Sequence, residues 1–333
     1  MKKIYKIFIL SIVVFSVFLS CGFATQAETA APNEAYCFPL TPDTDAEAWA
    51  ELQSHTAKVA ACQIPENLLA TMSTEALLET VKNYPLSVDF YAYNTLEMGY
   101  SALKSQFNGI EELERRYTSS EDAMRQIDNA AICAQTSALS QQAQAFEDFF
   151  IEDVVQELQK QNGSAAEDES ADLLIQPFAT ADVVKTPRGS NVPVVKDCTW
   201  ATHNQTRLRV SQLDKQAAKT YPRAVKIQEI SPKYNCHSYA WYSTASTNRY
   251  WMDNPSPYIA DGSYYSTGNS RWYAGGKIVW SNSTEGIVHS GIIMTVSEHR
   301  LDNIRSKWGL MGTYEHLVSD CPYSGAITGY FPA

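Results

Sequence analysis

The sequence is poor in positive charge. Its 333 residues include 26 Lys and Arg against 37 Asp and Glu, for a formal net charge of −11. No stretch is basic enough to indicate nucleic-acid binding. No internal repeat is visible, and no Cys and His spacing matches a standard zinc pattern, not even that of Cys198, His203, Cys236 and His237. We therefore expect no nucleic-acid partner, no metal and no cofactor.

The N-terminus has the pattern of an export signal. A positive start, "MKKIYK", precedes the apolar run "IFILSIVVFSVFLSCGF" and the small residues "ATQAETAAP". This pattern predicts a bacterial signal peptide over residues 1–27, cleaved after Ala27, and hence a secreted or cell-envelope associated protein. Two alternatives remain. The run stays uncut as a membrane span, or Cys21 carries a lipid anchor, although Phe18 is unfavourable for lipid attachment three residues before that Cys.

The remaining chain divides into two units of different charge. Residues 28–176 carry 26 acids and 7 bases, a net −19, whereas residues 177–333 carry 11 acids and 16 bases, a net +5. The polar, acidic stretch 162–178 is typical of a linker. We therefore expect a helical domain over 28–161 and a second domain over 179–333.

The first unit has few Gly or Pro and apolar residues at helical spacing. Helices are predicted at "STEALLETVK", capped by Ser73 or Thr74, at 109–117, and from about 120 to 161 with a break. No titratable cluster stands out, and the expected use of this helical bundle is binding, spacing or covering.

The second unit consists of short segments rich in Val, Thr, Tyr and Trp. A hairpin is predicted around Pro187 to Gly189, and a helix over 209–230 that breaks near Pro222. A strand series follows in "GKIVWS", "GIVHSGIIMTVS", "NIRSKWG" and "TYEHLVS". A helix that carries Cys236, followed by an antiparallel sheet, indicates an α+β fold.

Cys236, in "NCHSYAWY", is the candidate nucleophile. A cysteine nucleophile needs a lowered pKa, a base within reach and a group that orients the base. Asn235 is predicted to cap a helix whose first turn contains Cys236, where unpaired N–H groups favour a thiolate. The adjacent His237 points away from the thiol. The candidate base is His289, which begins a strand and is followed by the small pair Ser-Gly.

The order of these residues resembles papain-like cysteine peptidases. Cys236 on a helix, His289 on a strand and "SKWG" 17 residues after that His match the family's order of Cys, His and polar orienter. The resemblance gives Ser306 the orienter's place, where the family has Asn, and Trp308 the place of the shielding Trp. Lys307 and His316 are alternatives for the third member.

The resemblance covers residues 225–325 and is closest to the bacterial NlpC-like branch. It implies a Cys-bearing helix packed on an antiparallel sheet, and cleavage of amide bonds in cell-wall peptides or peptidoglycan. In this mechanism His289 deprotonates Cys236, and the Cys236 N–H with a side chain binds the oxyanion. Gln228 is the candidate side chain. Aromatic residues either wall a substrate groove or belong to the core: Trp251, Tyr264, Tyr265, Trp272 and Trp280.

Two other interpretations compete with catalysis. Six cysteines follow the signal, so Cys236 is half of a disulfide if all six pair. Pairing of Cys37 with Cys62 and of Cys198 with Cys321 instead leaves Cys236 free and Cys133 buried on a helix. The alternative function is a catalytically silent secreted binding or adhesion protein on a papain-like scaffold; acyl transfer is a third use of the same thiol.

Overall fold

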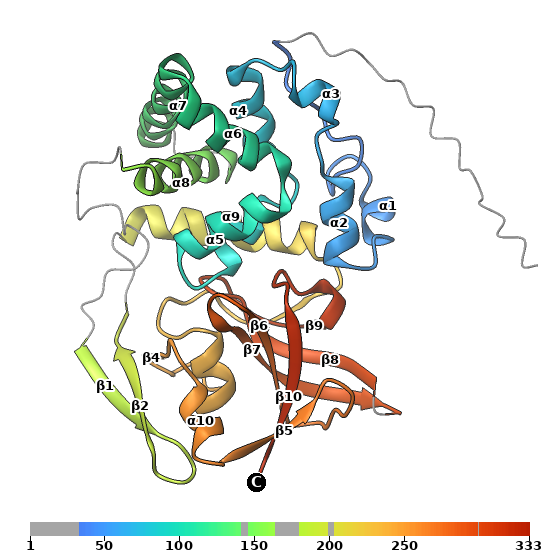
Figure 1. Cartoon of the computed structure of the whole chain (residues 1–333), viewed down its shortest axis with the longest axis vertical. Helices are drawn as coiled ribbons and strands as arrows, with labels where there is room; N and C mark the ends of the chain where they lie inside the picture. Colours follow the sequence, from blue (N-terminus) through green and yellow to red (C-terminus); the bar gives the residue numbers. More distant parts are fainter. Residues whose placement is uncertain (1–32, 141–145, 164–179, 199–202, 299) are drawn as a thin grey trace, which may run out of the picture.

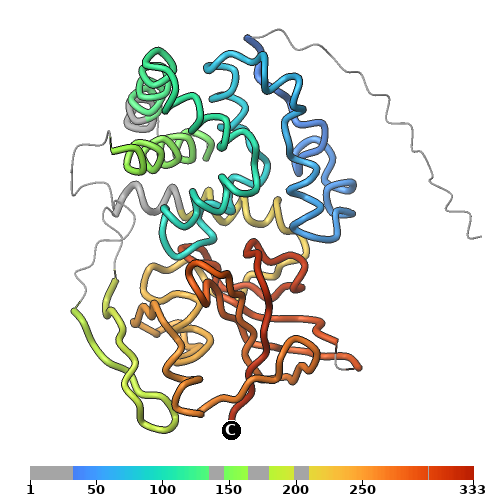
Figure 2. Tube along the Cα trace, viewed as in Figure 1, coloured from blue at the N-terminus to red at the C-terminus, as the bar shows by residue number. Residues whose placement is uncertain are grey.

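The computed structural model describes residues 33–140, 146–163, 180–198, 203–298 and 300–333. The predicted signal peptide and most of the predicted linker lie outside these ranges. Helices fill one half of the molecule and strands the other, and helix α9 lies between them (Figure 1). The chain trace enters the helical half first and ends beyond the sheet (Figure 2).

The helical half contains eight α-helices and a 3-10 helix within the described residues. Their bounds are α1 Ala46–Ala50, α2 His55–Ala61, α3 Glu66–Leu69, α4 Thr74–Lys82, η1 Ser87–Ala92, α5 Leu96–Gln106, α6 Asn108–Ser119, α7 Glu121–Ser140 and α8 Phe146–Gln161. The predicted cap is confirmed, because the Ser73 side chain accepts from Ala76 N at 3.2 Å. The break expected in the long helix falls between α7 and α8.

The strand half contains a seven-stranded antiparallel sheet of order β3-β9-β8-β7-β6-β10-β5. Its strands are β3 Val225–Gln228, β5 Tyr264–Gly268, β6 Lys277–Asn282, β7 Gly286–Ser297, β8 Arg300–Lys307, β9 Thr313–Leu317 and β10 Ala326–Pro332. The predicted strand series and the hairpin of β1 Thr180–Lys185 with β2 Asn191–Lys196 are confirmed. Strand β4 Tyr250–Trp251 extends that hairpin, and α10 Ser256–Ala260 precedes β5. The α+β class is therefore correct.

The helix predicted over 209–230 is wrong in its second half. Helix α9, His203–Thr220, ends just before Pro222, which cannot continue a helix, and the chain then forms β3. Val225 and Ile227 are β-branched residues at alternate positions, a pattern that favours a strand. The helical pattern of apolar residues therefore ends with α9 and does not continue into β3.

Helix α9 buries its apolar face against both halves. Leu213, Ala217 and Tyr221 belong to the largest buried hydrophobic cluster, which also contains Phe150 of α8 and Ile304 of β8. The spacing of four residues places Leu213 and Ala217 on one face of the helix, and Tyr221 directly follows its last residue, Thr220. The two predicted units therefore share a continuous core.

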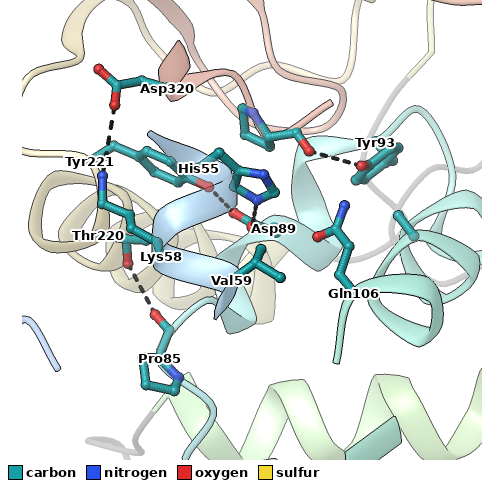
Figure 3. Close-up of polar contacts among 12 residues, drawn as sticks. His55, Lys58, Val59, Pro85, Asp89, Tyr93, Gln106, Thr220, Tyr221 and Asp320 are labelled. Atoms are coloured by element: carbon teal, nitrogen blue, oxygen red, sulfur yellow. Dashed lines mark hydrogen bonds and ion pairs between the residues drawn. The ribbon is translucent and has the colours of Figure 1, made fainter. Parts of the chain in front are cut away.

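Buried charged groups also join the halves (Figure 3). His55 Nε2 lies 2.8 Å from Asp89 Oδ2, and the Tyr221 hydroxyl donates to Asp89 Oδ1 at 2.5 Å. Lys58 Nζ lies 3.8 Å from Asp320 Oδ1, with both side chains almost fully buried. This cluster was missed in the sequence because its members come from segments far apart in the chain.

Candidate nucleophile site

Asn235 fixes the start of the short helical turn that carries Cys236. Its Oδ1 accepts from Ser238 N at 3.1 Å and from Met252 N at 3.3 Å, and its Nδ2 donates to Met252 O at 2.8 Å. The turn continues as a five-residue π-helix, η3 Ser238–Tyr242. The expected cap is present, and the helix ends at Tyr242.

The Cys236 turn packs directly against strand β7. The Ser290 hydroxyl lies 2.8 Å from His237 Nδ1 and accepts from Trp241 Nε1 at 2.9 Å. Three fully buried polar side chains thus hold the turn on the sheet. His237 has a structural role here, which agrees with its rejection as the base.

The Cys236 thiol is fully buried. It donates to Asn94 Oδ1, with 3.8 Å between the heavy atoms. Burial raises its pKa to about 11, while the backbone N–H groups of Ser290 and His237 and the charge of Lys307 act in the opposite direction. Several groups that favour a thiolate therefore surround the sulfur, but desolvation keeps the resting thiol protonated.

Lys307 is a fully buried cation near this thiol. Its Nζ donates to Gly309 O and Met311 O, each at 2.7 Å, and lies 5.4 Å from the ring centroid of Tyr234. No carboxylate pairs with it in the described part of the chain. Burial lowers its pKa to about 7, opposed by its interaction with Cys236.

His289 is buried, and the contacts of its ring are aromatic. Its ring stacks on Tyr323 at 3.8 Å between centroids and lies 5.0 Å from the ring of Trp280. Within the described residues, neither ring nitrogen has a hydrogen-bond partner, so no Cys236 to His289 hydrogen bond is formed. Burial lowers the pKa of His289 well below its usual value, and the imidazole is neutral. This is unlike an ordinary core histidine, whose nitrogens are satisfied.

Ser306 and Trp308 contact a different histidine. Ser306 Oγ lies 2.9 Å from His316 Nε2, and Trp308 Nε1 donates to the same nitrogen at 3.2 Å. His316 Nδ1 lies 2.8 Å from Leu317 O. The residues expected to orient and shield His289 thus orient His316, itself a candidate for the third place.

Gln228 ends strand β3 with its amide already engaged. Its Oε1 accepts from the Tyr234 hydroxyl at 2.6 Å, and its Nε2 donates to Thr244 O at 2.8 Å. In this arrangement the amide N–H is directed at the Thr244 carbonyl, which leaves the side-chain place beside Cys236 to another residue.

The side chain that does contact the Cys236 thiol is that of Asn94, which no sequence pattern singles out. Asn94 lies in the helical half, 142 positions before Cys236, between η1 and α5. Neither periodicity nor spacing relates two residues so far apart, and only the packing of the two halves brings them together.

Most of the aromatic residues considered for a groove belong to the core. Trp251, Trp272 and Trp280 are buried, whereas Tyr264 is half-buried and Tyr265 is 51% exposed. The core interpretation therefore holds for the three tryptophans.

All six cysteines of the described chain are free thiols, and none lies at disulfide distance from another. Neither Cys37 with Cys62 nor Cys198 with Cys321 is paired. Cys133, expected to be buried, is exposed on α7. Cys198 packs instead with Trp251 and Leu310.

The described ranges contain no group of His, Cys, Asp and Glu that would hold a metal ion. Among the helices in the same ranges, none has both the length and the apolar character needed to span a bilayer.

No family model, no curated protein and no solved structure matches this chain. The papain-like resemblance therefore depends on the Cys236, His289 and "SKWG" motifs alone.

Proposed function

We propose that this protein is a cysteine peptidase or amidase with Cys236 as its nucleophile. The observation that carries the proposal is the setting of the Cys236 sulfur. The sulfur, at the start of a capped turn, is faced by the N–H groups of Ser290 and His237. His289, the residue before Ser290 along β7, is a buried imidazole whose two nitrogens have no hydrogen-bond partner in the described structure. Such groups are typical of catalytic sites.

In the proposed reaction the thiol proton passes to His289, and the sulfur attacks the carbonyl carbon of an amide. The C=O electron pair moves to the oxygen, where N–H groups stabilise it. Collapse breaks the C–N bond, and His289 returns the proton to the leaving amine. Water then hydrolyses the acyl-enzyme. Because catalytic hydrogen bonds often form only with substrate bound, closure of the Cys236 to His289 contact belongs to the substrate complex.

The proposed substrates are peptides of the bacterial cell wall, and the proposed location is outside the cell or at its envelope. Two features support this: the N-terminal signal pattern and the net charge of +5 over residues 177–333, which suits an anionic polymer.

The test is release of new amino groups from purified peptidoglycan and from a peptide library. We expect Cys236→Ala and His289→Ala to reduce the rate to background. Cys198→Ala is the matched control, because it removes another buried thiol outside the site and retains activity. Equal rates for the wild type and Cys236→Ala would refute the proposal.

A second candidate function is ligand binding without catalysis. The complete burial of the Cys236 sulfur favours it, because a covered thiol with a pKa raised to about 11 is a poor nucleophile at rest. If the wild type binds peptidoglycan but releases no amine, and Cys236→Ala binds equally well, this second function is the correct one.

A further inference from the structure

Asn94 is a side chain of the helical half that is hydrogen-bonded to the candidate nucleophile. Its Oδ1 accepts from the Cys236 thiol, with 3.8 Å between oxygen and sulfur. Ser290, His237 and Lys307 are fully buried, whereas Asn94 is half-buried. Asn94 is therefore the least buried of these four residues.

The backbone that carries Asn94 is fixed by the strand half. Leu310 N lies 3.2 Å from both Tyr91 O and Tyr93 O, and the Tyr93 hydroxyl donates to Pro322 O at 3.0 Å. The Tyr93 ring packs on Tyr323 at 4.4 Å between centroids, and Tyr323 in turn stacks on His289. Asn94 is thus held beside the sulfur by contacts on the residue preceding it.

The approach of the two backbones is unusually close at Gly309. A Cβ at this position would lie 1.9 Å from Tyr93 O, and its φ of +42° lies in the left-handed region. Only glycine fits this contact without displacement of the chain. The local geometry is therefore built to bring the Tyr93 and Asn94 segment against the strand half.

A carboxamide suits both states of the reaction. It presents its carbonyl oxygen to a neutral thiol, as observed, and after half a turn about the Cβ–Cγ bond it presents N–H groups to an anion. The amide of Gln228 is engaged with Tyr234 and Thr244. Asn94 is then the available side-chain donor beside the sulfur.

We propose that Asn94 is a catalytic residue, the side-chain donor of the oxyanion hole, supplied to Cys236 by the helical half. This inference rests on the proposed function. It gives the helical half a part in the chemistry: the site is complete only when the two halves are packed together, and the half is not a detachable cover.

The test compares two reactions of the full chain at Cys236. p-Nitrophenyl acetate acylates the sulfur: the S–C bond forms through an oxyanion, the ester C–O bond breaks, nitrophenolate leaves and the thiol proton goes to His289. Iodoacetamide alkylates the sulfur by displacement of iodide, with no carbonyl oxyanion at the reacting carbon. An oxyanion donor accelerates the first reaction and not the second.

For Asn94→Ala we expect acylation of Cys236 to slow by about 10²-fold, with alkylation unchanged or faster. Asn94→Asp keeps the shape of the side chain but has no N–H donors, and it slows acylation as well. Glu97→Gln, an exposed change three residues away, is the matched control and behaves as the wild type. Thermal unfolding verifies that each variant is folded.

Three results overturn the inference alone. The first is equal acylation rates in Asn94→Ala and the wild type. The second is acceleration of both reactions in Asn94→Ala, which would mean that Asn94 only blocks access to the sulfur. The third is parallel loss of both reactions in Asn94→Ala and Asn94→Asp, because that pattern reports a displaced sulfur. Absence of Cys236 acylation in the wild type instead contradicts the proposed function.

Discussion

The burial of Lys307 makes the unfolding free energy depend on pH. Its pKa is lowered from 10.5 to about 7, so between these values the unfolded chain holds a proton that the folded chain has released. The unfolding free energy contributed by Lys307 therefore rises with pH from about 7 to 10.5, and below that window its full cost is present. This lysine opposes folding at neutral pH.

Lys307→Met removes this dependence. We expect the unfolding free energy of the variant minus that of the wild type to fall by at most about 1.4 kcal/mol per pH unit across the window. Urea denaturation at several pH values measures it. We follow how the difference between variant and wild type changes with pH, because the loss of the Lys307 donor to Gly309 O and Met311 O alters stability at every pH. Lys233→Met, an exposed control, tracks the wild type; a constant difference for Lys307→Met would contradict the account.

Single residues also show what sequence can reveal about a site. Asn235 was predictable as a cap because its partner, Ser238 N, lies three residues along the chain. The partners of Ser306 and Trp308 were not, since His316 comes from the facing strand, in a register that neither motif encodes. Asn94 was unpredictable for the same reason on a larger scale.

At the scale of elements, the close contact at Gly309 predicts a large penalty for a single methyl group. Gly309→Ala places a Cβ 1.9 Å from Tyr93 O at a left-handed φ of +42°. We expect a loss of roughly 3 kcal/mol or more in unfolding free energy, measured by urea denaturation. Gly286→Ala, with a φ of +77° and no atom within 4 Å, isolates backbone strain and loses only about 1 to 2 kcal/mol. Equal losses would show that the contact is not tight.

The strands were predicted better than the helix that joins the halves. In β6 to β9, β-branched and aromatic residues between turn residues mark each strand locally. Helix α9 instead borders Pro222 and the short edge strand β3, where helical and extended patterns overlap in the sequence. Its packing on the helical half depends on tertiary contacts, which explains why the charge-based division into two units did not reveal the shared core.

The whole molecule should lose stability in mild acid. Burial lowers the pKa of His237 and of His316 to about 4, and it lowers that of His289 well below its usual value. Below the unfolded value of about 6.5 the unfolded chain binds these protons first, so stability falls as pH decreases. Each histidine contributes about 2 kcal/mol of loss between pH 7 and 5.

Urea denaturation at pH 7 and pH 5 measures this loss. In His316→Asn, the loss over the same interval is smaller by about 2 kcal/mol, because one titrating group is gone. Equal unfolding free energies of the wild type at the two pH values would contradict the burial of these neutral imidazoles.

Whether Cys236 is the nucleophile is tested most sharply by locating the residue that becomes acylated. After p-nitrophenyl acetate reacts with the full chain, acid quenching, peptic digestion and tandem mass spectrometry locate the acetyl group. If Cys236 is the nucleophile and His289 its base, we expect one acetyl group on Cys236, absent in Cys236→Ala and strongly reduced in His289→Ala. Acetylation confined to the exposed thiols Cys37 and Cys133, with Cys236 unmodified, would contradict it.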